Sequence, residues 1–200
     1  MRVALTGGIA TGKSVVAHGL RDHGFRVIDT DQVARDVVAR GTDGLAAVVA
    51  RFGTAVVRGD GTLDRVALGR LVFGDVTARR DLEALLHPRI RREVDRFFET
   101  LSPEQEPGVA EIPLAYEAGW GATFDVVVVV ACDTATQRQR LMERDRLSAD
   151  DATLRLAAQW PIADKVRLAD AVVMTDGDLA STSAQTAMLA AWLRGRWRPS

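Results

Sequence analysis

The residues with the clearest chemical meaning are residues 7–14, which read GGIATGKS. This is the G-x-x-x-x-G-K-S spacing of the phosphate-binding P-loop. Its glycines allow a tight turn that points backbone N–H groups at a phosphate, and the helix that follows adds the positive end of its dipole. We expect Lys13 to reach the β- and γ-phosphates of a nucleotide and the Ser14 hydroxyl to hold Mg²⁺.

Two aspartates, Asp29 and Asp31, come at the end of a strand-like stretch at residues 25–29. A carboxylate beside a P-loop can accept the proton of an attacking hydroxyl, which is the role of the base in kinases. Asp31 can equally cap the next helix, because aspartate is favoured at that position. Asp29 can hold Mg²⁺ through water or only close the strand, so spacing alone leaves these alternatives open.

Arginines gather at residues 138–146 and again at residues 89–92. Arginine forks can offset the charge that spreads over the γ-phosphoryl oxygens, and a lid that carries them excludes water. The alternative is a solvated helix face paired with nearby acids. Glu111 and Glu117 match only in part the acidic residue that helps to order Mg²⁺ in other P-loop proteins.

The elements that must position these residues alternate between strand and helix, which predicts a parallel sheet with helices on both faces. The predicted strands cover residues 1–6, 25–29, 109–113, 125–131 and 171–174. The predicted helices cover residues 13–20, 32–39, 45–52, 64–73, 78–101, 134–145, 148–159 and 179–197. We expect a kink or restart at Pro88 and a loop at residues 102–108.

Residues 32–101 carry helices only and are too long for a simple crossover, so we predict a helical lobe over the carboxyl ends of the strands. The predicted organisation is a single domain, 1–200, with its core at about residues 1–31, 108–135 and 165–200. The helical acceptor lobe covers about residues 32–101, and a lid covers about residues 136–164.

The composition limits the classes of partner. A net charge of −1 argues against a nucleic-acid platform, which usually carries a basic excess. The longest apolar run, residues 126–132, is far shorter than the ~20 residues of a membrane span. With one cysteine no internal disulfide can form. We therefore expect a soluble cytoplasmic protein that binds neither nucleic acid nor membrane.

The chain resembles the dephospho-CoA kinase family over nearly its whole length. The resemblance rests on LTGGIATGKS (5–14), VIDTDQVAR (27–35), DGTLDR (60–65), LLHPRI (85–90), IPLAYE (112–117), QRLMERD (139–145) and ADAVV (169–173). It implies a P-loop kinase fold of three layers, α/β, with a five-stranded parallel sheet, an inserted helical acceptor lobe and a lid. It also implies transfer of the ATP γ-phosphate, with Mg²⁺, to the ribose 3′-hydroxyl of dephospho-CoA, the last step of coenzyme A biosynthesis.

The resemblance assigns roles by motif. It implies three catalytic residues, namely Asp31 as the base and Lys13 and Arg140 as the pair that stabilises the phosphates. It implies ATP contacts from Gly8, Ala10, Thr11, Gly12, Lys13, Ser14, Val15 and Arg144, with Ser14 on the metal. It implies acceptor contacts from Asp31, His87, Pro88 and Arg89. One departure is the stretch at residues 174–177, where MTDG replaces the D-N-x-G of the family near the adenine.

Two other functions remain open at this stage. Another P-loop nucleoside or nucleotide kinase would share the phosphate machinery and differ in its acceptor. A nucleotide-hydrolysing switch would need no acceptor, although the chain has no N-K-x-D motif for guanine. The expected partner is the small molecule dephospho-CoA, and the expected assembly is a monomer or a small homo-oligomer.

Overall fold

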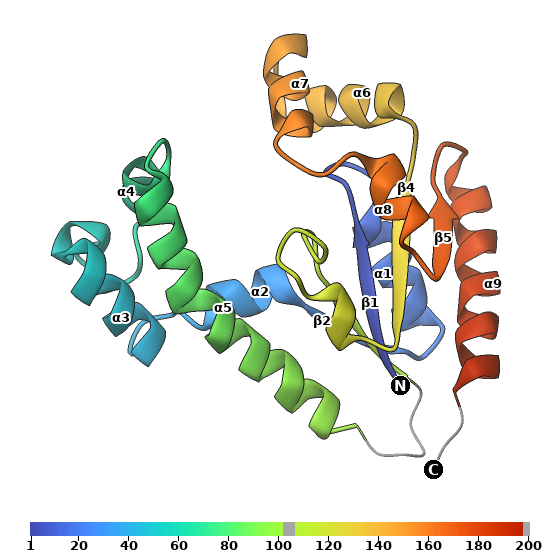
Figure 1. Ribbon diagram of the computed structural model, residues 1–200, viewed down its shortest axis with the longest axis horizontal. Helices are drawn as coiled ribbons and strands as arrows, with labels where there is room; N and C mark the ends of the chain where they lie inside the picture. Colours follow the sequence, from blue (N-terminus) through green and yellow to red (C-terminus); the bar gives the residue numbers. More distant parts are fainter. Residues whose placement is uncertain (102–106, 198–200) are drawn as a thin grey trace. The chain divides into compact units, whose positions relative to one another are not determined.

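Our computed structural model describes residues 1–101 and 107–197 of the chain. They form two compact units, which are described separately. We call Met1–Asp29 with Leu101–Ser200 the core unit and Thr30–Thr100 the helical unit (Figure 1). Most of the loop that the sequence predicts at residues 102–108 lies outside the described residues. None of the helices in the described part of the chain is long and apolar enough to cross a membrane.

A five-stranded parallel sheet forms the centre of the core unit, in the order β2-β3-β1-β4-β5. The strands are β1 (Arg2–Gly7), β2 (Arg26–Asp29), β3 (Gly108–Glu111), β4 (Val126–Ala131) and β5 (Ala171–Met174). β1 lies between β3 and β4, with Leu5 in register with Glu111 on one side and Val128 on the other. The predicted parallel five-stranded sheet is therefore confirmed, and β1 delivers the P-loop at the middle of its carboxyl edge.

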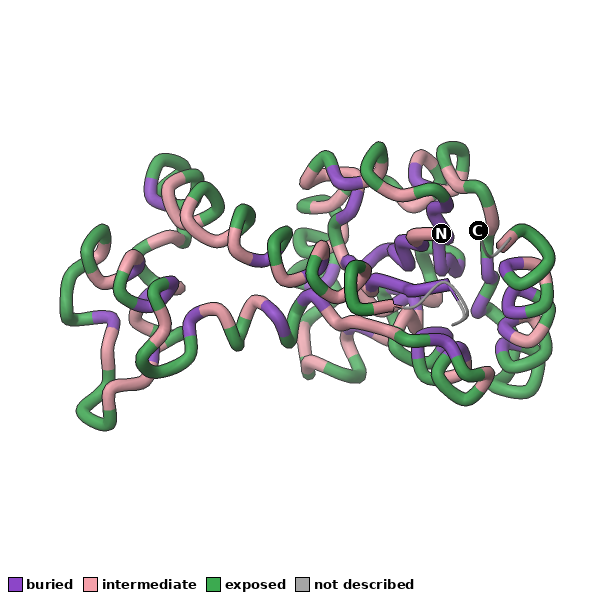
Figure 2. Tube along the Cα trace, turned by 90° about the horizontal axis from the view of Figure 1, so that it is seen from below, coloured by how far each residue is buried: buried purple, intermediate pink, exposed green. Residues whose placement is uncertain are grey.

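Strand β4 lies inside the sheet, between β1 and β5, and its side chains are apolar. All of its residues are buried, as expected for a parallel strand covered on both faces. Figure 2 shows the buried residues of the core unit concentrated along the strands. A strand of five consecutive valines has high strand propensity, because branched side chains pack well on a pleated surface.

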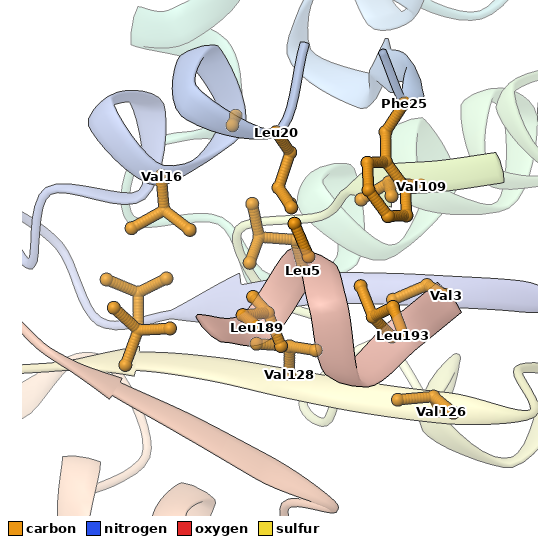
Figure 3. Packing of buried hydrophobic residues seen from close by; sticks show 14 residues of the cluster. Val3, Leu5, Val16, Leu20, Phe25, Val109, Val126, Val128, Leu189 and Leu193 are labelled. Carbon is orange, nitrogen blue, oxygen red and sulfur yellow. The ribbon is translucent and has the colours of Figure 1, made fainter. Parts of the chain in front are cut away.

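Two helices, α1 (Lys13–Asp22) and α9 (Leu179–Arg196), pack against each other and against the sheet. Their contact needs a small residue, because a Cβ on Gly19 would lie only 2.9 Å from Cγ2 of Thr186. Figure 3 shows the resulting core, in which side chains of both helices meet those of the strands. Its members include Val3, Leu5, Val16, Leu20, Phe25, Val109, Val128, Leu189 and Leu193. This packing fixes the start of α1, and with it the P-loop.

The remaining helices of the core unit are α6 (Thr134–Asp145), α7 (Ala149–Ala157) and α8 (Ile162–Arg167). α6 has the predicted bounds, and Asp133 caps it by accepting a hydrogen bond from the N–H of Thr136. Ser148 caps α7 by accepting a hydrogen bond from the N–H of Asp151, and the helix ends at Ala157, two residues before its predicted end. The short helix α8, after Pro161, was not predicted.

The helical unit consists of α2 (Thr30–Asp36), α3 (Asp43–Phe52), α4 (Arg65–Val72) and α5 (Val76–Glu99). Its core contains Val38, Leu45, Val48, Val56, Leu63 and Leu68. Asp64 caps α4, accepting hydrogen bonds from the N–H groups of Val66 and Ala67. The unit is helical throughout apart from short turns and one isolated bridge, Val57 to Leu63.

Of the kink or restart predicted at Pro88, the restart is wrong, because α5 runs through this proline without a break. The kink stays a prediction. A proline removes one backbone hydrogen bond and disturbs the neighbouring bonds of the helix. Here the guanidinium of Arg89 donates a hydrogen bond of 2.6 Å to the carbonyl of Leu85, within that disturbed turn. The side chain thus supplies a donor close to the one that the proline lacks.

Candidate active site

The P-loop follows β1 directly, and its first glycine is required by space. A Cβ on Gly7 would lie 2.3 Å from the carbonyl oxygen of Val130 in β4, closer than real Cβ contacts. Gly12 has φ +82°, in the left-handed region, and precedes the first residue of α1. These two glycines let the chain turn sharply between the central strand and the helix, as the motif predicted.

Hydrogen bonds within the loop hold its shape. The buried hydroxyl of Thr11 donates to the carbonyl of Gly8 at 2.9 Å. The Lys13 ammonium lies over the same loop, with Nζ 3.4 Å from the Gly8 carbonyl oxygen. Ala10 has φ +60°, a conformation that side chains other than glycine rarely adopt, and such strain is typical of functional loops.

The start of α1 favours an anion. Its first turn has no acidic residue, so no carboxylate within that turn offsets the positive end of the helix dipole. Lys13 adds a full positive charge at the same end, and Ser14 exposes its hydroxyl there. The loop amides, the helix end and the ammonium group together form a site for phosphate oxygens.

Arg140 of α6 reaches the P-loop through Thr175, the residue that follows β5. One guanidinium nitrogen donates to the Thr175 hydroxyl at 3.1 Å, and another donates to its carbonyl at 2.6 Å. The Thr175 hydroxyl in turn donates to the carbonyl of Thr11 at 2.8 Å. The predicted neighbourhood of Arg140 and the P-loop is therefore present, and Thr175 is the residue that connects them.

A cavity of about 340 Å³ lies beside this connection. It is lined by Gly12, Val15, Arg140, Thr175, Gly177, Asp178, Leu179 and Thr182. The sequence marked the 174–177 stretch as a departure from the family pattern but did not predict the contact of Thr175 with Arg140. Its position, one residue after the last strand of a parallel sheet, was the signal that pointed to the carboxyl edge.

Two glutamines that no motif marked also contact the P-loop. The N–H of Ile9 donates to Oε1 of Gln159 at 2.9 Å, and Nε2 of Gln137 donates to the Ile9 carbonyl at 2.8 Å. Both glutamines line a second cavity of about 650 Å³, which also borders Gly8, Arg138 and Trp160. These contacts bring α6 and the connection between α7 and α8 onto the phosphate loop.

Arg144 makes a different set of contacts. Its guanidinium donates to both carboxylate oxygens of Asp145, at 2.8 and 3.2 Å, and Arg155 donates to the same carboxylate. The hydrogen bond with Asp145 raises the pKa of Arg144, and the same bond lowers the pKa of Asp145. Arg144 borders neither of the two cavities, so its contact with a nucleotide stays a prediction.

The predicted base and acceptor residues all belong to the helical unit. Asp31 is exposed and lies in the first turn of α2, which begins at Thr30. It is the second residue of the helix, and the choice between a base and a helix cap stays open. His87 and Pro88 are exposed on α5, while Arg89 has its Nε 3.5 Å from a carboxylate oxygen of Asp43. The roles of these four residues stay predictions.

Glu117 forms an ion pair with a buried lysine. Its Oε1 lies 2.6 Å from the ammonium nitrogen of Lys165, a side chain with no exposed surface. A buried ammonium needs a partner of opposite charge, so this carboxylate is committed to the ion pair. Among residues 1–101 and 107–197, no group of three or more histidine, cysteine, aspartate or glutamate residues is arranged to hold a metal ion.

Comparison with known proteins adds a family to this geometry. A sequence model described as dephospho-CoA kinase matches residues 1–181. The dephospho-CoA kinase of Symbiobacterium thermophilum is 44% identical over 95% of this chain and 79% of its own length. That of Moorella thermoacetica is 45% identical over 95% of this chain and 90% of its own length. The crystal structure of TT1252 from Thermus thermophilus superimposes with a TM-score of 0.81 at 35% identity, covering 96% of this chain and 97% of the other.

Proposed function

The chain belongs to the dephospho-CoA kinase family, and from this premise we propose how its residues perform the reaction. It is a phosphotransferase of the last step of coenzyme A biosynthesis, with ATP as the phosphoryl donor. The observation that best supports our assignment of roles is the meeting of the P-loop and Arg140 at one cavity. The P-loop and Arg140 are more than 120 residues apart in the sequence, yet the fold brings both to the carboxyl edge of the sheet.

On the donor side, we assign the triphosphate to the amides of the loop and of the first turn of α1. Gly8 shapes the turn, and Ala10, Thr11, Gly12, Lys13, Ser14 and Val15 wrap the phosphates. The adenine ring takes the 340 Å³ cavity, where Val15 and Leu179 supply apolar contacts. Arg144 adds a further contact when it leaves Asp145. Loop amides and a helix end are suited to this task because they need no rearrangement when the charge arrives.

Arg140 and Lys13 share the charge of the transferred group in this proposal. Two guanidinium nitrogens of Arg140 already donate to Thr175, which fixes the orientation of the fork. A guanidinium has five N–H donors, so others remain for a γ-phosphoryl oxygen. Lys13 provides a point charge over the loop, where its Nζ lies 3.4 Å from the Gly8 carbonyl oxygen.

A magnesium ion fits the donor set at Ser14. A hydroxyl oxygen is a hard ligand, and Mg²⁺ in kinases takes few protein ligands because water and phosphate oxygens complete its octahedron. The exposed position of Ser14 on the first turn of α1 leaves room for those oxygens. When bound, the ion neutralises charge on the β- and γ-phosphates.

On the acceptor side, we assign Asp31 as the general base and His87, Pro88 and Arg89 as contacts for dephospho-CoA. The ribose 3′-oxygen attacks the γ-phosphorus, and its proton passes to the Asp31 carboxylate. The bond between the γ-phosphorus and the β,γ-bridging oxygen breaks, and ADP leaves. The position of Asp31, exposed in the first turn of α2 directly after strand β2, supports this role because an acceptor hydroxyl can approach an exposed carboxylate.

We also propose a cytoplasmic location, where ATP is available, and a monomer or small homo-oligomer as the active form. The test of function is ADP release from purified protein, ATP and Mg²⁺ with a panel of acceptors. We expect release with dephospho-CoA and little with other nucleosides, nucleotides or water. Equal release with another nucleoside or nucleotide would favour a different kinase, and equal release without any acceptor would favour a nucleotide-hydrolysing switch.

A further inference from the structure

The peptide groups on both sides of Ile9 are held by side chains that come from far along the chain. Its N–H donates to Gln159 at 2.9 Å, across 150 residues, and its carbonyl accepts from Gln137 at 2.8 Å, across 128 residues. We call these two contacts the glutamine bracket. A loop residue whose N–H and carbonyl are both bonded has little freedom to rotate its peptides.

The bracket depends on the shape of the P-loop itself. A Cβ on Gly8 would lie 2.4 Å from Nε2 of Gln137, so only glycine allows this approach. Gln137 is 4% exposed, and burial leaves its amide few alternatives to the Ile9 carbonyl. The second residue of the P-loop is thus small for a reason beyond the turn, namely room for the glutamine that holds its neighbour.

Gln159 is fixed in its turn by the residue that follows it. The N–H of Trp160 donates to Oε1 of Glu117 at 3.1 Å, and the same oxygen lies 2.6 Å from the ammonium of Lys165. The Trp160 ring also stacks on Tyr116, with the ring planes 3° apart. Because Lys165 is fully buried, its carboxylate partner cannot leave without stranding a charge. The connection between α7 and α8 is therefore anchored where Gln159 meets the loop.

The bracket also separates the loop amide that bonds to a glutamine from the amides that can bind phosphate. The N–H of Ile9 is occupied by Gln159, so the amides left for phosphate begin at Ala10. Ala10 has φ +60°, which a residue other than glycine keeps only when its surroundings enforce it. The fixed peptides of Ile9 provide that enforcement on the preceding side.

We propose that Gln137 and Gln159 are positioning residues for phosphoryl transfer, which set the orientation of the P-loop amides by holding Ile9. The expected effect of the glutamines on catalysis rests on the proposed function, whereas their effect on the peptides of Ile9 does not. In this proposal the glutamines do not contact the reacting atoms. They act through the P-loop backbone, whose amides contact the phosphates.

The first test is amide hydrogen exchange at Ile9 in the nucleotide-free protein. Gln159→Leu removes the acceptor at similar volume, and we expect exchange at Ile9 to rise about five- to tenfold, as for one lost hydrogen bond. Gln159→Glu keeps an oxygen at the same place and should keep the protection. Gln139→Leu is the matched control, because Gln139 is exposed on α6 and donates a hydrogen bond to Glu143 of the same helix. Unchanged exchange in Gln159→Leu would overturn the proposal.

The second test separates positioning from general stability. In Gln137→Leu and Gln159→Leu we expect the KM for ATP to rise about five- to tenfold each, while the KM for dephospho-CoA stays within twofold. Because both residues hold one residue of the loop, the double variant should lose less than the product of the two effects. Equal increases in both KM values, or a fully multiplicative double variant, would indicate independent structural roles.

A failure of the proposed function has a different signature. If the wild-type protein transfers no phosphate to dephospho-CoA, the KM values cannot be compared. Amide exchange at Ile9 still tests whether Gln159 holds the N–H of that residue. If Gln137→Leu does not fold, which its melting curve reports, the pair Gln159→Leu and Gln159→Glu decides the matter alone. Loss of protection in both of these variants would contradict the role of the amide oxygen.

Discussion

Arg140 offers the sharpest test of the donor site, because its contacts predict separate effects on rate and on stability. In Arg140→Met the guanidinium is lost while the aliphatic part of the side chain is kept. The charge it offers to the transferring group is then missing. We expect kcat to fall by about 10²- to 10³-fold, the usual effect of removing one donor that stabilises charge in a transition state.

The stability effect follows from Thr175. Its carbonyl loses a donor at 2.6 Å and its hydroxyl loses one at 3.1 Å, while the hydroxyl keeps its bond to Thr11. Leaving a buried carbonyl without its donor costs about 1–3 kcal/mol. We therefore expect the free energy of unfolding to fall by about that amount, which is too little to unfold a domain of ordinary stability.

The assay pairs steady-state kinetics with urea unfolding. Arg140→Lys keeps the positive charge, but an ammonium group cannot donate to Thr175 and to a phosphate oxygen with the planar geometry of a guanidinium. Its kcat should therefore lie between those of Arg140→Met and the wild type. Arg21→Met is the matched control, since Arg21 is exposed in the last turn of α1. If Arg140→Met loses stability but keeps kcat within threefold of wild type, Arg140 is a structural link to Thr175 and the reasoning is refuted.

Three further predictions follow from other parts of the chain. Asp31→Asn should lower kcat at least ~10²-fold, the lower end for loss of a general base, while calorimetry shows ATP binding retained; a full rate would remove Asp31 from the mechanism. Gly7→Ala should lower the free energy of unfolding by about 1–3 kcal/mol, because its Cβ would lie 2.3 Å from the Val130 carbonyl oxygen. Gly59→Ala, where a Cβ meets nothing within 4 Å, is its control, and equal urea midpoints would contradict the close approach. Arg144→Gln should raise the depressed pKa of Asp145 in an NMR titration, since the Arg144 hydrogen bond is the largest cause of the shift. A depressed carboxyl pKa stabilises the fold above its unfolded pKa and loses that effect as pH falls through the folded pKa, so the variant should lose less stability in acid than wild type does; an unmoved pKa would rule out this pairing in solution.

Local signals explain what the sequence could predict. The P-loop is set by contacts between near neighbours, such as the left-handed Gly12 and the bond from Thr11 to Gly8, so its motif was sufficient. α6 was predicted with its bounds, Thr134–Asp145, and both ends are set locally, by the Asp133 cap at its start and by the left-handed Arg146, with φ +54°, directly after its end. The strand β4 was found because a run of valines has no alternative to burial.

Long-range contacts explain why the sequence did not predict the glutamines. Gln137 and Gln159 carry no motif, and only the fold brings them to Ile9 across more than a hundred residues.

Two local features were also not predicted correctly. α8 has six residues, too few to show a helical period, and the clearest sign of it in the sequence is Pro161 before it. The restart at Pro88 was predicted wrongly because the general rule for proline in helices does not include local contacts, such as the hydrogen bond from the Arg89 guanidinium to the Leu85 carbonyl in the same turn.

The measurement that tests the central claim most directly is phosphorus NMR of the product formed from ATP, Mg²⁺ and dephospho-CoA. We expect one new phosphomonoester on the ribose 3′-oxygen for each ADP released, and no product with Lys13→Ala, which lacks the P-loop ammonium. Inorganic phosphate appearing with ADP in place of that ester, or an ester on another oxygen, would contradict the account.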